Sequence, residues 1–102
     1  MTHSILLNGT WTASEGPQTF QAANPATEET LPGVFPVSPW SEIDKVIQAA
    51  AYAAKEMRGW PGSRFAEFLD SYAEEIEART DDLVAAANAE TGLPVSPRLK
   101  DG

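Results

Sequence analysis

The sequence predicts an α+β fold in which short strands precede three helices. The first observation is a run of apolar residues at helical spacing across residues 63–79. The second is the pair Asn8-Gly9 between two short runs of β-forming residues, which is the favoured pair for a two-residue hairpin turn. The third is the occurrence of three prolines within residues 24–37, which excludes a helix there.

The β elements are expected to be short. Residues 4–7 and 10–13 are predicted to form two strands joined by the Asn-Gly turn, which requires positive φ at both central positions. Residues 19–22 are predicted to form a third strand that ends at Asn24-Pro25. The chain therefore begins with a hairpin and extended region, residues 1–37, followed by a three-helix region, residues 38–92.

Three helices are predicted, near residues 39–58, 64–78 and 81–91. Ser38, Ser63 and Thr80 are expected to be their N-caps, since a hydroxyl can accept a hydrogen bond from a free backbone N–H of the first turn. Gly92 is expected to end the third helix, because glycine readily adopts the left-handed conformation of a helix terminus.

The apolar face of the middle helix needs a partner surface. It carries Phe65, Phe68, Leu69, Tyr72, Ala73 and Ile76, whereas the neighbouring helices offer mainly alanine. Alanine removes less apolar area from water than leucine or phenylalanine, so a free-standing core would be thin. This mismatch predicts that part of the protein is missing from the chain.

The composition excludes several classes of partner. The formal net charge is −8, and no Lys or Arg precedes Lys45, which argues against nucleic-acid binding. No apolar run approaches the ~20 residues needed to cross a bilayer, so we expect a cytoplasmic protein without a membrane partner. The absence of cysteine excludes disulfides, thiolate metal sites and a cysteine nucleophile within these residues.

The candidate chemical groups favour structural roles. His3, the sole histidine, lies in a terminus that we expect to be frayed, without Cys, Asp or Glu partners for a metal site or triad. Glu74, Glu75 and Glu77 could form paired carboxylates, but their spacing predicts a solvated face, with Glu75 pairing with Arg79.

Trp11, Trp40 and Trp60 could form a stacking surface, but without basic neighbours they are expected to pack. The seven glycines form no phosphate-binding loop. We therefore predict no catalytic, cofactor-binding or metal-ligating residue in this chain.

Five stretches, taken in order, carry a family resemblance. They are Leu7-Asn8-Gly9-Thr10-Trp11, Asn24-Pro25-Ala26-Thr27-Glu28-Glu29 after Phe20, Ile43-Asp44 with the alanine run from Ala49 to Ala54, Phe65 to Arg79, and Glu90-Thr91-Gly92-Leu93-Pro94. Together they resemble the N-terminal segment of the aldehyde dehydrogenase superfamily. Glu28 departs from the pattern, because the family usually has glycine there, so we expect a turn of different shape after Thr27.

The resemblance implies part of an α/β nucleotide-binding domain in an NAD- or NADP-dependent enzyme that oxidises an aldehyde to a carboxylate. The family's nucleophilic cysteine, glutamate base and cofactor loops all lie beyond the position of Gly102, so none is assigned here. The implied partners are the remainder of the polypeptide, a small aldehyde and, at full length, further copies in a homo-oligomer. Glu90-Thr91-Gly92-Leu93-Pro94 with Arg98 is most similar to the branch acting on 2-oxoglutarate semialdehyde (2,5-dioxopentanoate), although Val95-Ser96-Pro97 departs from it.

An alternative from another class is a small acidic helical module that binds a partner protein through an exposed apolar face. On either hypothesis the 102-residue chain alone is expected to bind no cofactor and to lack dehydrogenase activity, since it has no thiolate.

Overall fold

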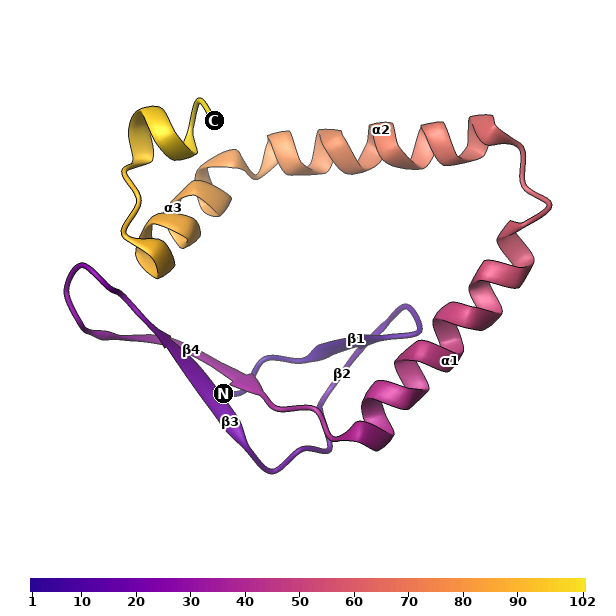
Figure 1. The fold of residues 1–102 in the computed structure, drawn as a ribbon, viewed down its shortest axis with the longest axis horizontal. Coiled ribbons are helices and arrows are strands. Elements are labelled where there is room, and N and C mark those ends of the chain that lie inside the picture. Colours follow the sequence, from indigo (N-terminus) through magenta and orange to yellow (C-terminus); the bar gives the residue numbers. More distant parts are fainter. The chain divides into compact units, whose positions relative to one another are not determined.

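The computed structural model describes residues 1 to 102 and contains four strands followed by three helices (Figure 1). The strands are β1 (Ile5–Leu7), β2 (Thr10–Thr12), β3 (Thr19–Ala23) and β4 (Thr30–Pro36). The helices are α1 (Trp40–Met57), α2 (Gly62–Ala78) and α3 (Thr80–Thr91), and a short kinked turn, η1 (Val95–Leu99), follows them. The predicted α+β class is confirmed.

The chain divides into two compact units. The first comprises residues 1–21 and 32–60, and it holds β1, β2 and α1. The second comprises residues 22–31 and 61–102, and it holds the tip of the β3–β4 hairpin together with α2, α3 and η1.

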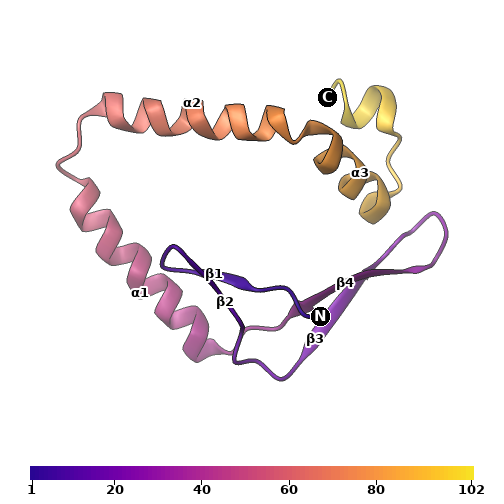
Figure 2. The ribbon, with the colours of Figure 1, turned by 180° about the vertical axis from the view of Figure 1, so that it is seen from behind.

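In the first unit, β1 and β2 form the predicted antiparallel hairpin (Figure 2). Leu6 pairs with Trp11 at the centre of its register. The turn residues Asn8 and Gly9 both have positive φ, 49° and 79°, as a type I′ turn requires. The hairpin prediction is therefore confirmed, with strands one residue shorter at each outer end.

The N-terminal residues are ordered, so the prediction of a frayed terminus at His3 is wrong. Thr2 forms a parallel bridge with Val34 of β4, and the backbone N–H of His3 donates to the Val34 carbonyl at 2.8 Å. The His3 ring also stacks on Phe35, with ring centroids 4.7 Å apart. A backbone hydrogen bond and a ring contact together hold this segment on β4.

The three helices lie within two residues of their predicted bounds, but the three predicted N-caps are wrong. No side chain caps α1, α2 or α3, whose N-cap residues are Pro39, Pro61 and Arg79. Both prolines are extended at ψ near 150–160°, and these cap residues lie one residue after Ser38 and two residues before Ser63. Thr80 lies inside α3, where its hydroxyl donates to the Glu77 carbonyl at 2.8 Å.

Gly92 ends α3 as predicted. It adopts φ 70°, and its N–H donates to the Asn88 carbonyl at 2.9 Å. A Cβ at this position would lie 3.4 Å from Pro25 of the hairpin tip in the same unit. This is an ordinary contact distance, so it is the left-handed conformation that favours glycine.

The hairpin tip retains the backbone conformation that glycine would permit. Glu28 has φ 61°, in the left-handed region, and its N–H donates to the Asn24 carbonyl at 2.8 Å. The expectation that Glu28 would change the shape of this turn is therefore wrong. The glutamate adopts the unusual conformation because the turn is held by its backbone hydrogen bonds.

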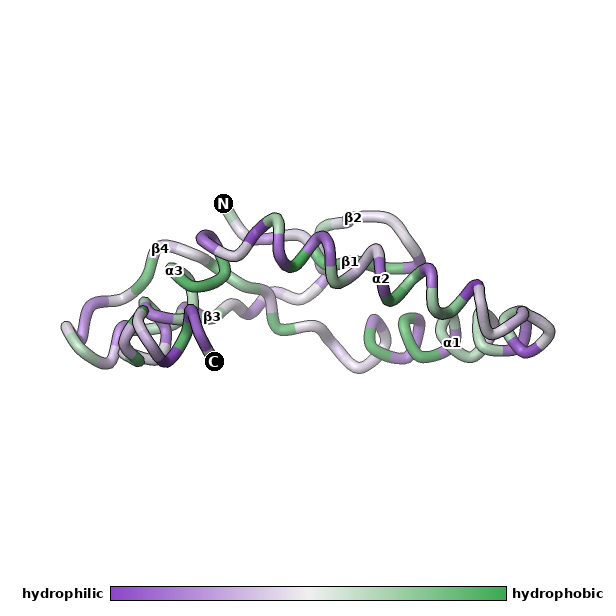
Figure 3. Tube along the Cα trace, turned by 90° about the horizontal axis from the view of Figure 1, so that it is seen from above, coloured by the Kyte–Doolittle hydropathy of each residue, from purple (hydrophilic) through white to green (hydrophobic).

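The chain buries no hydrophobic side chain. On α2 the exposed fractions are 65% for Phe68, 61% for Leu69, 60% for Tyr72 and 45% for Ile76. Figure 3 shows hydrophobic and hydrophilic residues alternating along this helix. The apolar face predicted from the sequence thus exists, and nothing in the chain covers it. None of the helices combines the length and apolar character needed to cross a membrane.

Candidate functional site

The most highly organised polar site of the first unit is centred on Glu42, in the first turn of α1. Glu42 is the one buried charged side chain, 4% exposed. Its carboxylate accepts a 2.6 Å hydrogen bond from the Ser14 hydroxyl and a 2.9 Å bond from the Glu15 backbone N–H. The site therefore joins the segment after β2 to the beginning of α1.

This environment favours the ionised form of Glu42. The hydrogen bonds from the Ser14 and Ser38 hydroxyls and from the Glu15 N–H lower the pKa of the carboxyl below its ordinary value. The positive charge of Lys45 acts in the same direction, whereas burial opposes it. A carboxylate that its donors keep ionised is suited to a structural role as a hydrogen-bond acceptor. It is poorly suited to accepting a proton from a substrate.

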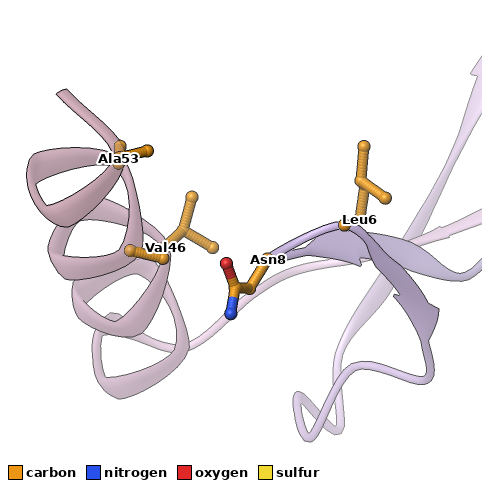
Figure 4. A pocket seen from close by; sticks show the side chains of 7 residues that line it. Leu6, Asn8, Val46 and Ala53 are labelled. Atoms are coloured by element: carbon orange, nitrogen blue, oxygen red, sulfur yellow. The ribbon is translucent and has the colours of Figure 1, made fainter. Parts of the chain in front are cut away.

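An apolar groove lies between the β1–β2 hairpin and α1, with a cavity volume of about 310 Å³. Figure 4 shows the Asn8 side chain pointing from the hairpin turn toward Val46 of α1, with Leu6 and Ala53 also on the lining. Asn8 is the sole residue with a polar side chain among the seven that line it. The groove has no titratable side chain and so offers no acid–base chemistry.

The residues considered from sequence are not brought together. His3 lies against Phe35, and no group of three or more His, Asp or Glu side chains could hold a metal ion. Glu75 forms the predicted i,i+4 pair with Arg79, whose Nε lies 3.9 Å from the Glu75 Oε2, and Glu74 and Glu77 are exposed. These glutamates therefore lie on the solvent-exposed face of α2.

The three tryptophans were predicted to be packed. This prediction is wrong for Trp11 and Trp40, which no other part of the chain covers. Trp11 is 70% exposed and Trp40 is 82% exposed, whereas Trp60 is half-buried. The physical reason is the missing cover: a short hairpin and the first residue of a helix offer no surface large enough to enclose an indole.

The helix N-termini of this chain lack the glycine-rich entry that is typical of a dinucleotide site. Phosphates bind best at a helix N-terminus entered through a glycine-rich loop. Here Pro39, Pro61 and Arg79 precede the helices, and Asp81 and Asp82 place negative charge in the first turn of α3. A phosphate would be repelled there.

Sequence reasoning missed Glu42. A partial signal exists, because an acidic residue in a first turn is stabilised by the helix dipole. Its partners Ser14 and Glu15 lie 28 and 27 residues away in sequence, so no local pattern indicates the contact.

The fold of this chain matches part of a solved structure. It superposes on the crystal structure of an aldehyde dehydrogenase from Bartonella henselae with a TM-score of 0.87 and 24% sequence identity. The superposition covers 96% of this chain and 20% of that one. The two proteins therefore share the fold of this segment.

The sequence comparisons give the family. The model of the aldehyde dehydrogenase family matches residues 11–101. Putative aldehyde dehydrogenases from Staphylococcus aureus strains bovine RF122 / ET3-1 and MSSA476 are 36% and 34% identical to this chain over 90 residues. Each alignment covers 88% of this chain and 19% of the relative, so the chain spans about a fifth of their length. The chain belongs to the aldehyde dehydrogenase family.

Proposed function

We propose that this chain is the N-terminal segment of an NAD- or NADP-dependent enzyme that oxidises an aldehyde to a carboxylate. The observation that carries the proposal is the family match over residues 11–101. The uncovered apolar face of α2 supports it, since Phe68, Leu69 and Tyr72 need a surface that this chain does not provide. The remainder of the dehydrogenase polypeptide is the partner that would cover them.

In this proposal the chain has a structural role. It contains no cysteine to attack a carbonyl carbon, and its helix N-termini do not fit a dinucleotide. The nucleophile, the base and the cofactor site therefore belong to residues outside this chain. The chain contributes the β1–β2 hairpin and three helices with apolar faces.

The finer assignment concerns the substrate and the assembly. Glu90-Thr91-Gly92-Leu93-Pro94 resembles the branch acting on 2-oxoglutarate semialdehyde, an aldehyde that carries one carboxylate next to a 2-oxo group. Arg98 follows shortly after this motif. We assign this substrate class, a homo-oligomeric assembly and a cytoplasmic location to the whole enzyme as parts of the same proposal.

The test begins with the coding sequence after codon 102, where the proposal expects a Gly-rich βα turn and, later, a cysteine in a loop. The encoded polypeptide would be purified and assayed with NAD+ or NADP+ against 2-oxoglutarate semialdehyde and a neutral aliphatic aldehyde of similar length. Reduced cofactor would be followed by its near-ultraviolet absorbance. Turnover of both aldehydes supports the family activity, and a higher kcat/KM for the acidic aldehyde supports the finer assignment.

A polypeptide that is stably folded, contains no such downstream segment and turns over neither aldehyde would overturn the proposal. The competing interaction module is favoured by one observation, the exposed apolar face of α2. It predicts a monodisperse chain of 102 residues that unfolds cooperatively without further polypeptide. The two hypotheses therefore give opposite results in a thermal unfolding experiment on residues 1–102.

A further inference from the structure

We propose that the Glu42 carboxylate is a pH-sensitive latch that holds the segment Ser14–Gly16 against the first turn of α1. The Glu42 latch is defined here as this carboxylate with its donors on Ser14 and Glu15. It does not rest on the proposed oxidation reaction, because none of its residues, all in the first compact unit, is assigned a part in that reaction.

Consecutive polar groups of the segment are all directed at this site. The Ser14 hydroxyl donates to one carboxylate oxygen at 2.6 Å, and the Glu15 N–H donates to the other at 2.9 Å. The Gly16 N–H donates in turn to the Ser14 hydroxyl oxygen at 3.1 Å. Three successive residues thus depend, directly or through Ser14, on one carboxylate.

The same segment also lies close to the residues that precede α1. A Cβ built on Gly16 would overlap the Val37 carbonyl oxygen, and it would lie 3.3 Å from Pro39. Just beyond, the Val37 N–H donates to the Gln18 carbonyl at 2.8 Å. The segment therefore lies directly against the backbone that leads into α1. The Glu42 carboxylate holds it there by accepting the hydrogen bonds from Ser14 and Glu15.

The latch also sets the spacing of the groove. Glu42, Val46, Ala50 and Ala53 follow at steps of four, four and three residues, so they lie on one face of α1. The last three line the groove opposite Leu6 of β1. Because Ser14 follows β2 by only two residues, fastening Ser14 limits how far the hairpin can move from α1.

The charges around the site give the latch its pH dependence. Lys45 of α1 and Glu15 of the segment are the charged side chains beside it, and they pair with each other at 3.7 Å. The donors lower the pKa of Glu42 below its ordinary 4.5. A group with a depressed folded-state pKa contributes stability that is present above the unfolded pKa and is lost as the pH falls through the folded pKa. The latch is therefore closed near neutrality and opens in acid, when protonation removes the negative charge and turns one of the two acceptor oxygens into a donor.

The experiment measures hydrogen exchange at the amides of Glu15 and Gly16, at residue resolution, in the polypeptide as its gene encodes it. Rates are corrected for the intrinsic exchange rate at each pH. At neutral pH, Glu42→Gln should reduce protection of these two amides by about tenfold or more. Ser14→Ala should also reduce the protection of these two amides from exchange, without changing any charge. The matched control is Glu56→Gln, an exposed glutamate on the same helix, which should leave them unchanged.

The acid arm compares wild type with Glu42→Gln from about pH 6 down to about pH 3, below the ordinary range of a glutamate. Wild type should lose protection at Glu15 progressively, whereas the variant should start low and change little. Protection that is the same in wild type, Glu42→Gln and Ser14→Ala would overturn the proposal. So would a loss in Ser14→Ala that spreads equally to the amides of α3, because that would be general unfolding instead of local release.

Discussion

The backbone N–H of Glu28 donates to the carbonyl of Asn24 at 2.8 Å, and Glu28 is held there with a φ of 61°. The Asn24 N–H donates back to the Glu29 carbonyl at 2.8 Å, and the Asn24 side-chain oxygen accepts from the Ala26 N–H at 2.9 Å. The tip of the β3–β4 hairpin is thus closed by hydrogen bonds that impose a left-handed conformation on a residue with a Cβ.

Glu28→Gly should stabilise the protein. The left-handed conformation costs an L residue roughly 1–2 kcal/mol, and glycine gives back part of this through its larger unfolded-state entropy. We expect a net gain of up to about 1 kcal/mol in the free energy of unfolding, measured by urea titration. Glu29→Gly removes the same charge at a position without positive φ, so it should give no gain. Equal gains in the two variants would show that charge is responsible.

Gly16→Ala should destabilise the first unit. The added methyl group would overlap the Val37 carbonyl oxygen, and overpacking against backbone costs about 1–3 kcal/mol. The control is Gly62→Ala, where a Cβ meets nothing within 4 Å in the first turn of α2. Because alanine favours helix over glycine, that variant should be neutral or slightly stabilising. Denaturant unfolding of both variants checks the prediction, which would be wrong if Gly16→Ala were tolerated as well as Gly62→Ala.

Glu75→Gln should change stability by no more than about 0.5 kcal/mol, because exposed i,i+4 pairs contribute little. Its partner Arg79 is at 3.9 Å, and both side chains are more than 70% exposed. The measurement is the unfolding midpoint at low and at roughly 1 M salt, where screening should abolish even this small difference. A loss above 1 kcal/mol would contradict the assignment of these glutamates to a solvated face.

The chain of residues 1–102 on its own should bind an apolar dye. The aromatic rings of Phe68 and Tyr72 stack on α2 at 6.1 Å between centroids while both remain at least 60% exposed. Phe68→Ser with Leu69→Ser should reduce the dye fluorescence severalfold, as expected for the loss of an exposed apolar patch. Glu67→Ser with Asp70→Ser, on the same helix, should not. A chain that binds no dye would indicate that α2 finds cover without further polypeptide.

The same isolated chain should show no aldehyde-dependent reduction of NAD+ or NADP+. It has no thiol to form the covalent adduct, and acidic side chains occupy the first turn of α3. The assay is cofactor absorbance with several aldehydes, and the control is a family enzyme of full length under identical conditions. Activity that follows the elution peak of the chain through repurification would refute the prediction.

Helical periodicity predicted α1, α2 and α3 within two residues because each carries apolar residues at steps of three and four. The Asn8-Gly9 turn was predictable for a similar reason, since its conformation depends on those two residues alone. Both are local properties of the chain.

The N-caps and the Glu42 site were not predictable in this way. Serine is a favoured N-cap residue, yet Pro39 and Pro61 take the cap position in place of Ser38 and Ser63. The burial of Glu42 depends on residues 27 and 28 positions away, which no local pattern contains.

Arg79 alone separates α2 from α3, ending the first helix and preceding the second. Successive helical residues are about 100° apart around the axis, so one residue added or removed here would turn the whole of α3 by that angle relative to α2. Leu83 and every following residue of α3 would then turn by the same angle about the helix axis. A substitution at Arg79 therefore changes one side chain. An insertion or deletion at this junction changes the direction of every side chain of α3.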